Sequence, residues 1–309
     1  MSQDVLGYQE LDAHGRWRSE PGYGRVWVPI RLAAGWAPYR DGHWTWIAPW
    51  GWTWVDDAPW GFAVSHYGRW AHLRGGWCWV PGPVRRRAYY APALVAFVGG
   101  TNFRLSLASG SVGAVAWFPL APREVYRPSY PVSRGYLENI NRSNTVVNAS
   151  VINHTYNNYT TTVTNVSNVV YANRQVPGAV VAVHAAAFVQ SQPVSRAAVP
   201  VSGQQLANTP VASAAPVAPT QASVHGAAAG GADKPPAPVL QRRVLARTAP
   251  PLAQPGFAAQ QPTLSAKPGK PLDDATRKTL PPSTLGPAPA VQVLTPARTA
   301  QPTTPPALQ

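Results

Sequence analysis

Apolar and polar positions alternate along two imperfect repeats near the start of the chain, and tryptophan fills most of the apolar positions. The repeats are WAPYRDGHWTWIAPWGWTWV (36–55) and WGFAVSHYGRWAHLRGGWCWV (60–80). All thirteen tryptophans of the 309-residue chain lie between Trp17 and Trp117. Residues two apart lie on the same face of a strand. The pattern therefore predicts tryptophan-bearing β-hairpins.

Turn residues fix which tryptophans share a face, since a one-residue change of register turns a strand over. Pro49, Trp50 and Gly51 suit a three-residue loop that places Trp46 opposite Trp54. A two-residue Gly75–Gly76 loop places His72 opposite Trp79. Two faces are predicted, one with Trp44, Trp46, Trp52 and Trp54, the other with Trp70, His72, Trp77 and Trp79.

A weaker copy of the hairpin covers residues 15–29, with Trp17 and Trp27 as its anchors. Three hairpins in succession predict a meander, and residues 114–122 (AVAWFPLAP) could supply a closing strand. The fold class predicted for residues 1–122 is therefore all-β, a Trp-rich β-hairpin repeat domain.

The composition changes twice after this domain. Residues 123–196 include an Asn-, Thr- and Val-rich tract, for which an extended or β segment is expected, with a short helix near 180–189. Residues 197–309 hold 21 of the 35 prolines and a single aromatic residue, Phe257. Such a segment has too little apolar surface to offset its ordering entropy and is predicted to be a disordered Pro/Ala/Gln-rich tail.

The paired tryptophans have two interpretations. An indole face can form a stacking surface for sugars or bases, but the early chain has few other large apolar residues to fill a core. We therefore expect most of them in the core: Trp44, Trp46, Trp52, Trp54, Trp70, Trp77 and Trp79. Trp50, at a turn tip, and Trp60, between Pro59 and Gly61, are the candidate exposed contacts with a ligand.

The net charge of +14 is spread along the chain and favours an anionic partner such as an acidic polysaccharide, lipid headgroups or nucleic acid. Solubility explains the charge equally well. Arg85, Arg86 and Arg87 form the densest positive run and are candidate ligand contacts, although such a run is more often a solvated loop. Arg16 and Arg69 precede tryptophans and are expected on the solvent face.

No motif of a known reaction is present. Cys78 is the only cysteine, which excludes an internal disulfide, and the histidines lack metal-ligand spacing. Asp41 with His43 is at most half of an acid/base pair, and the adjacent Asp56 and Asp57 point in opposite directions on a strand. We predict no catalytic residues, no metal, no cofactor and no enzymatic activity. A cleft with a perturbed carboxylate near Asp41 or Asp56 would reopen the question.

The order of motifs resembles an uncharacterised family of tryptophan-rich, exported bacterial proteins, a domain of unknown function often found C-terminal to a FecR-like domain. The motifs include DVLGYQELD (4–12), GWAPYRDGHW, WGWTWVDDAPWGF, WFPLAPREVYRPSYPVSRGY and NRQVPGAVVAVHAAAFV. The resemblance covers about 190 residues and implies a protein of the periplasm or cell surface. No signal peptide or transmembrane stretch is apparent in the sequence, so a cytoplasmic location stays open.

Two functions remain. The first is a non-enzymatic cell-envelope module that binds or scaffolds polysaccharide, peptidoglycan or a protein partner. The alternative is Arg- and Trp-mediated binding of nucleic acid or another anionic surface. The sequence leaves the oligomeric state open.

Overall fold

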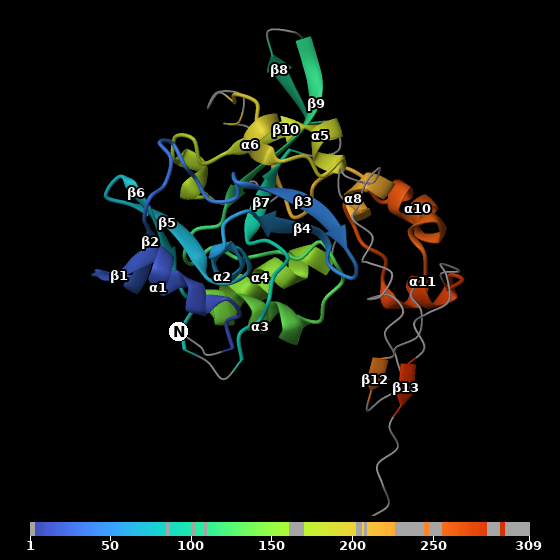
Figure 1. The fold of residues 1–309 in the computed structure, drawn as a ribbon, viewed down its shortest axis with the longest axis horizontal. Coiled ribbons are helices and arrows are strands. Elements are labelled where there is room, and N and C mark those ends of the chain that lie inside the picture. The colour runs from blue at the N-terminus through green and yellow to red at the C-terminus, as the bar shows by residue number, and fades with distance from the viewer. Residues whose placement is uncertain are drawn as a thin grey trace, which may run out of the picture.

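The structure is a computed structural model. It describes residues 4–84, 87–99, 103–107, 110–160, 170–201, 206, 209–225, 244–246, 255–282 and 291–293. Most strands pair antiparallel in a body that also carries helices (Figure 1). The fold is thus mostly β, as predicted, but it is not all-β, because it carries more helices than the short one expected near 180–189.

The first sheet holds two of the three predicted hairpins in the order β1-β2-β6-β5. Its strands are β1 (Gly15–Glu20), β2 (Gly24–Pro29), β5 (Arg69–Leu73) and β6 (Gly76–Val80). Trp27 of β2 is the partner of Trp79 on β6 and of Trp17 on β1. A short 3-10 helix, Tyr8–Glu10, and α1 (Leu11–His14) precede β1.

The remaining hairpin, β3 (Gly42–Ile47) with β4 (Gly51–Asp56), forms a two-stranded sheet of its own. The predicted meander is therefore wrong: the central hairpin is not part of the first sheet, and β2 pairs directly with β6. The helix α2 (Gly61–His66) connects β4 to β5.

Both predicted registers are displaced by two positions. Trp46 is opposite Trp52, and His72 is opposite Trp77. The second turn is formed by Arg74 and Gly75, whose φ angles of 53° and 76° are those of a type I′ turn. A displacement of two leaves every side chain on the same face, so both predicted faces are present despite the error.

A second sheet has the order β10-β9-β7-β11, and β8 also pairs with β9. Its strands are β7 (Val95–Val98), β8 (Arg104–Leu107), β9 (Gly110–Pro119), β10 (Val181–His184) and β11 (Val211–Ala212). The predicted closing strand, residues 114–122, lies largely in β9 and so belongs to this sheet rather than to the hairpin sheet. The β8–β9 hairpin projects from the body in Figure 1.

The Asn-rich tract contains two helices, α3 (Arg134–Asn144) and α4 (Ala149–Thr160), where an extended segment was expected. Ser133 caps the N-terminus of α3, because its side chain accepts a hydrogen bond from the Tyr136 amide. Leu137, Ile140 and Asn144 follow at helical spacing on the buried face. The prediction for the described part of this tract is therefore wrong; residues 161–169 lie outside the described residues.

The short helix expected at 180–189 begins late, because residues 181–184 extend the second sheet as β10 before α5 (Ala185–Val189). A 3-10 helix, Asn173–Gln175, precedes β10, and α6 (Val194–Ala197) follows α5.

Parts of the segment predicted to be disordered are ordered. They include β11, α8 (Gln221–His225), α10 (Phe257–Ala266), α11 (Asp274–Thr279) and a parallel pair of β12 (Val244–Ala246) with β13 (Val291–Val293). Leu264 and Leu272 are buried in the main core, and the Trp52 indole donates a hydrogen bond to the Val217 carbonyl. Scattered Leu and Val residues of this Pro-rich segment pack against the core that contains β3 and β4, which its overall composition does not indicate. Residues 202–205, 207–208, 226–243, 247–254, 283–290 and 294–309 of the predicted tail lie outside the described residues.

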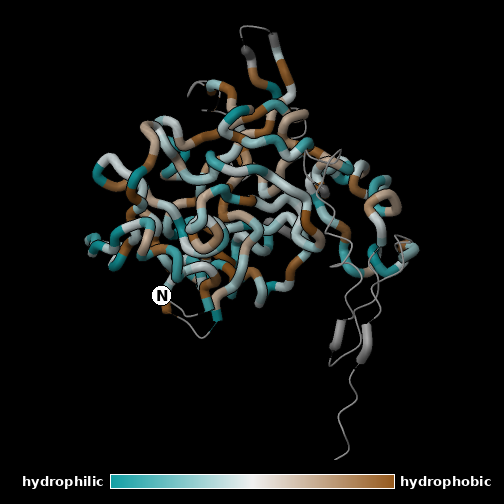
Figure 2. Tube along the Cα trace, viewed as in Figure 1, coloured by the Kyte–Doolittle hydropathy of each residue, from teal (hydrophilic) through white to brown (hydrophobic). Residues whose placement is uncertain are grey.

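The main core is largely aromatic. Fully buried indoles of Trp27, Trp44, Trp54, Trp79 and Trp117 lie in or between the sheets. Tryptophan has a mid-scale hydropathy, so this part of the core is pale in Figure 2, while brown segments mark its aliphatic portions. Each buried indole removes roughly 150–250 Å² from water, which compensates for the scarcity of Leu, Ile and Phe.

Candidate functional site

The tryptophan faces of the two repeats are interior surfaces. The seven tryptophans expected in the core are each at most 8% exposed: Trp44, Trp46, Trp52, Trp54, Trp70, Trp77 and Trp79. Several buried indoles donate to backbone carbonyls, Trp70 to Val64 and Trp79 to Tyr67 among them. A ligand cannot reach these faces without unfolding the protein, so they do not form a stacking surface.

A cleft of about 260 Å³ opens beside this core. The end of α1, the segment from Ile30 to Asp41, the end of β4 and the turn before α2 line it. Arg31 and Tyr39 of its wall have φ angles of 57° and 61°. Non-glycine residues rarely adopt this left-handed conformation, and it is concentrated at functional sites.

Two indoles form the aromatic wall of the cleft. Trp36 is half-buried and Trp60 is 7% exposed. Their ring centroids are 5.8 Å apart, and Trp60 also packs on Trp27 at 5.1 Å. The exposed ring expected at Trp60 is therefore wrong: Trp27 and Trp36 cover it, and only the part that faces the cleft meets solvent.

Two half-buried carboxylates, Asp41 and Asp56, lie in the same cleft. Asp56 accepts hydrogen bonds from the Trp54 indole at 2.9 Å, the Ala58 amide at 3.0 Å and the Ser65 hydroxyl at 3.3 Å. Among the described residues, none bonds to the Asp41 carboxylate. Asp41 is thus available to a ligand, whereas Asp56 is engaged with the protein.

Burial raises the pKa of Asp56 to about 6, although its three hydrogen bonds act in the opposite direction. A carboxyl group with a raised pKa beside a second carboxylate is a feature of acid/base sites. The donors around Asp56 hold its oxygens toward the protein, which favours a structural role over proton transfer.

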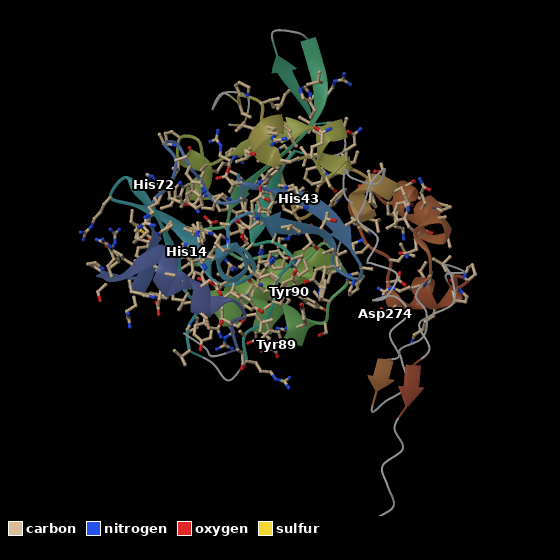
Figure 3. The ribbon with its side chains drawn as sticks, in the orientation of Figure 1. His14, His43, His72, Tyr89, Tyr90 and Asp274 are labelled. Carbon is tan, nitrogen blue, oxygen red and sulfur yellow. The ribbon has the colours of Figure 1, made fainter. Side chains whose placement is uncertain are left out.

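Histidines do not assemble a metal site with these carboxylates. His14 lines the cleft, while His43 and His72 lie elsewhere on the body, as the labels in Figure 3 show. Within the described part of the chain, no three His, Cys, Asp or Glu side chains gather closely enough to hold a metal ion. The cleft therefore offers aromatic faces and hydrogen-bond acceptors.

The turn-tip residue Trp50 lies on a different surface. It is half-buried and packs on Tyr90, with ring centroids 5.0 Å apart. The ring of Phe62, which is 43% exposed, has its centroid 6.1 Å from that of the same Tyr90 ring. Tyr90 is labelled in Figure 3. Arg87, three residues before Tyr90, is exposed; Arg85 and Arg86 lie outside the described residues. Trp50 and Arg87 are therefore separate from the residues that line the cleft.

Arg69 is another departure from expectation. It is 1% exposed, and its guanidinium donates to the carbonyls of Gly68 and Glu124 and to the Asn141 side chain. The sequence places Arg69 opposite the tryptophan face, but α3 covers that second face as well. Arg16, by contrast, is exposed as expected.

The pH dependence of the free energy of unfolding should reflect two groups whose pKa values are shifted in opposite directions, Asp56 and His66. The pKa of Asp56 rises from 3.8 to about 6, so the native state binds more protons than the unfolded state in this range and stability falls as pH rises. Burial lowers the pKa of His66 from 6.5 to about 4, so stability rises with pH between those values. The two trends nearly cancel from about pH 4 to 6.

The variant Asp56→Asn removes one of these trends. Its free energy of unfolding, measured in urea at a series of pH values, is expected to rise by about 3 kcal/mol from pH 4 to 6.5, whereas the wild type stays nearly level. Asp57→Asn, next to it on the exposed side, is the control: it removes only the smallest of the causes that raise the Asp56 pKa and should stay much closer to the wild type. A level profile for Asp56→Asn would contradict this account.

Single residues of the cleft could be predicted from the sequence, but not their meeting in one site. Asp41, Asp56 and Trp60 were candidates, whereas Trp36 and His14 carried no signal as their neighbours. The cleft is built by a loop that crosses from β2 to β3, and loop paths carry no periodic signal. The useful clue was the GWAPYRDGHW motif, which places Trp36 and Asp41 together.

No helix among the described residues is long and apolar enough to cross a membrane. No curated protein and no solved structure matches the chain. Residues 8–124, which contain every tryptophan and the whole cleft, match the family model described as Family of unknown function (DUF6600), so this part of the chain is similar to an uncharacterised family.

Proposed function

We propose that the protein is a non-enzymatic module of the bacterial cell envelope that binds polysaccharide, such as peptidoglycan, in the cleft. The observation that supports this most directly is the combination of the half-buried Trp36 indole, which packs on Trp60, with the free Asp41 carboxylate in one opening. Indole faces pack on the C–H surface of a sugar ring, and a carboxylate accepts hydrogen bonds from its hydroxyl groups.

The size of the cleft suits a single ring. Its volume of about 260 Å³ lies just below the roughly 300–1,000 Å³ of sites for drug-sized ligands. A longer glycan would place one residue in the cleft and run over the surface beyond it. The envelope location comes from the family resemblance of the sequence, and the binding role from the cleft.

Two carboxylates line the cleft against one guanidinium, that of Arg31, and this balance of charge disfavours phosphate. The proposal is thereby separated from the anionic-surface alternative. Outside the cleft, Phe62 has an exposed ring and Arg87 an exposed guanidinium, so these residues are the better candidates for contact with an anionic partner. The two proposals therefore predict different residues and different responses to salt.

Binding of soluble peptidoglycan fragments, measured by calorimetry on the full chain, tests the proposal. Trp36→Ala is expected to weaken binding by about 10- to 100-fold, as for the loss of one stacked ring. Trp50→Ala is the matched control and should leave the affinity unchanged, since Trp50 lies outside the cleft.

Raising the salt concentration to about 0.5 M should change the glycan affinity little, whereas phosphate-dependent binding of an oligonucleotide would fall steeply. A wild-type protein that binds no fragment, or an affinity that depends on Trp50 and not on Trp36, would contradict the cleft as the polysaccharide site.

A further inference from the structure

The turn between β4 and α2 carries Trp60, which supports the Trp36 indole in the aromatic wall of the cleft. Asp56 ends β4, Trp60 immediately precedes α2, and the Gly61 amide donates to the Ala58 carbonyl at 2.9 Å. The turn is short, so a movement of its first residues shifts the Trp60 ring.

The Asp56 carboxylate ties this turn to two other elements. One oxygen accepts the Ala58 amide within the turn, and the other accepts the Trp54 indole of β4 and the Ser65 hydroxyl of α2. Hydrogen bonds to an ionised acceptor are roughly twice as strong as those between neutral groups. Protonation of Asp56 therefore weakens three contacts that together hold the turn.

Gly61 supplies an independent sign of this close fit. A Cβ atom at position 61 would lie 2.3 Å from both Cγ and Oδ1 of Asp56. Gly61 begins α2 with an ordinary helical conformation, so its backbone does not require glycine. The absent side chain makes room for the carboxylate.

We infer that Asp56 is the positioning residue of the cleft: its carboxylate holds the turn that carries Trp60, so the charge on this one side chain controls how well the cleft binds polysaccharide. This inference rests on the function proposed for the cleft. It gives Asp56 a role through Trp60, while Asp41 contacts the ligand.

Several other groups near Asp56 could contribute to a pH response. Asp57 is adjacent on the chain and its charge also raises the pKa of Asp56. Asp41, His14, Arg31 and Tyr39 line the cleft with it. A test must therefore distinguish Asp56 from these neighbours.

The first experiment needs no ligand. In the full chain, the resonances of the Trp54 indole N–H and the Ala58 amide should titrate with a midpoint near pH 6. Asp56→Asn should abolish both titrations, whereas Asp41→Asn should leave them in place. Resonances that stay fixed in the wild type, or that still move in Asp56→Asn, would overturn the inference.

The second experiment measures peptidoglycan-fragment affinity against pH. The wild type is expected to bind about fivefold or more tightly at pH 7 than at pH 5, and Asp56→Asn should show a level profile. Asp41→Asn should bind more weakly but keep the pH step. A level wild-type profile overturns the inference, while a wild type that binds no fragment at any pH refutes the proposed function and leaves the resonances to decide the role of Asp56.

Gly61→Ala gives a third, pH-independent check. On its own it should weaken fragment binding, because the new methyl group displaces the carboxylate. In an Asp56→Ala background the same change should have little further effect, since contacting residues act non-additively. Equal effects in both backgrounds would show that the carboxylate and the turn are not coupled.

Discussion

Trp44→Ala is expected to lower the free energy of unfolding by about 3–5 kcal/mol, the cost of emptying a large aromatic site in a packed core. Trp44 is 1% exposed, and its ring contacts four others at centroid distances of 5.2–5.5 Å: Trp54, Phe97, Trp117 and Phe188. Urea unfolding followed by far-ultraviolet circular dichroism measures the change without relying on tryptophan fluorescence.

Trp50→Ala provides the comparison within the same hairpin. Its ring is half-buried and meets Tyr90 at the surface, so its loss should cost about 1 kcal/mol. Similar costs at the two positions would contradict the assignment of the tryptophan face to the core.

Substitution by phenylalanine separates ring packing from hydrogen bonding. The buried Trp44 indole N–H has no acceptor among the residues that the structure describes, whereas the Trp117 indole donates to the Tyr39 carbonyl at 3.1 Å. A buried polar group left unpaired costs about 1–3 kcal/mol. Trp44→Phe should therefore be the milder of the two phenylalanine variants.

Asn141→Leu is expected to lower the free energy of unfolding by about 3–5 kcal/mol, because it leaves a buried guanidinium and backbone groups without partners. The Asn141 oxygen accepts from Arg69 and the Tyr126 amide, and its amide group donates to the Tyr126 and Leu137 carbonyls. These four bonds use the ordinary capacity of an asparagine side chain.

Asn139→Leu, on the exposed face of the same helix, is the matched control and should change stability by less than about 0.5 kcal/mol. Thermal and urea unfolding of the intact chain measure both variants. If Asn141→Leu were as mild as the control, the link between α3 and Arg69 would contribute little to the fold.

The hairpin faces could be predicted from sequence because an error of two positions in strand register leaves each side chain on the same face. The predicted loops were displaced along the chain, yet Trp44 and Trp54 still share a face, since a shift of two positions preserves the alternation. The pairing itself could not be predicted: the turn is Arg74–Gly75, and Arg74 adopts a left-handed conformation at a position where glycine was expected.

The helices of the Asn-rich tract were missed for a reason that concerns tertiary contacts. Asparagine favours turns in isolation, because its side chain bonds to nearby backbone. Here Asn144 instead accepts the Gly68 amide and donates to the Tyr89 carbonyl, and Asn173 donates to the Trp70 and Pro119 carbonyls. A single sequence does not show which distant backbone such a side chain will meet.

The cleft was missed in the same way. Its acidic and aromatic residues were visible, but their meeting depends on how the segment from Ile30 to Asp41 crosses the end of β4. The left-handed conformations of Arg31 and Tyr39 have no sequence signature comparable to glycine.

The buried asparagines and the ordered segments near the C-terminus limit where the chain can be truncated. Residues 8–124, the segment that matches the family model, form hydrogen bonds with the side chains of Asn141 and Asn173. Their hydrophobic core also includes Leu264 and Leu272. In a fragment that ends at residue 124, the buried Arg69 guanidinium would lose its Asn141 partner. The outer side of the β3–β4 hairpin would become exposed to solvent. The unit recognised by sequence similarity is therefore smaller than the unit that should unfold cooperatively.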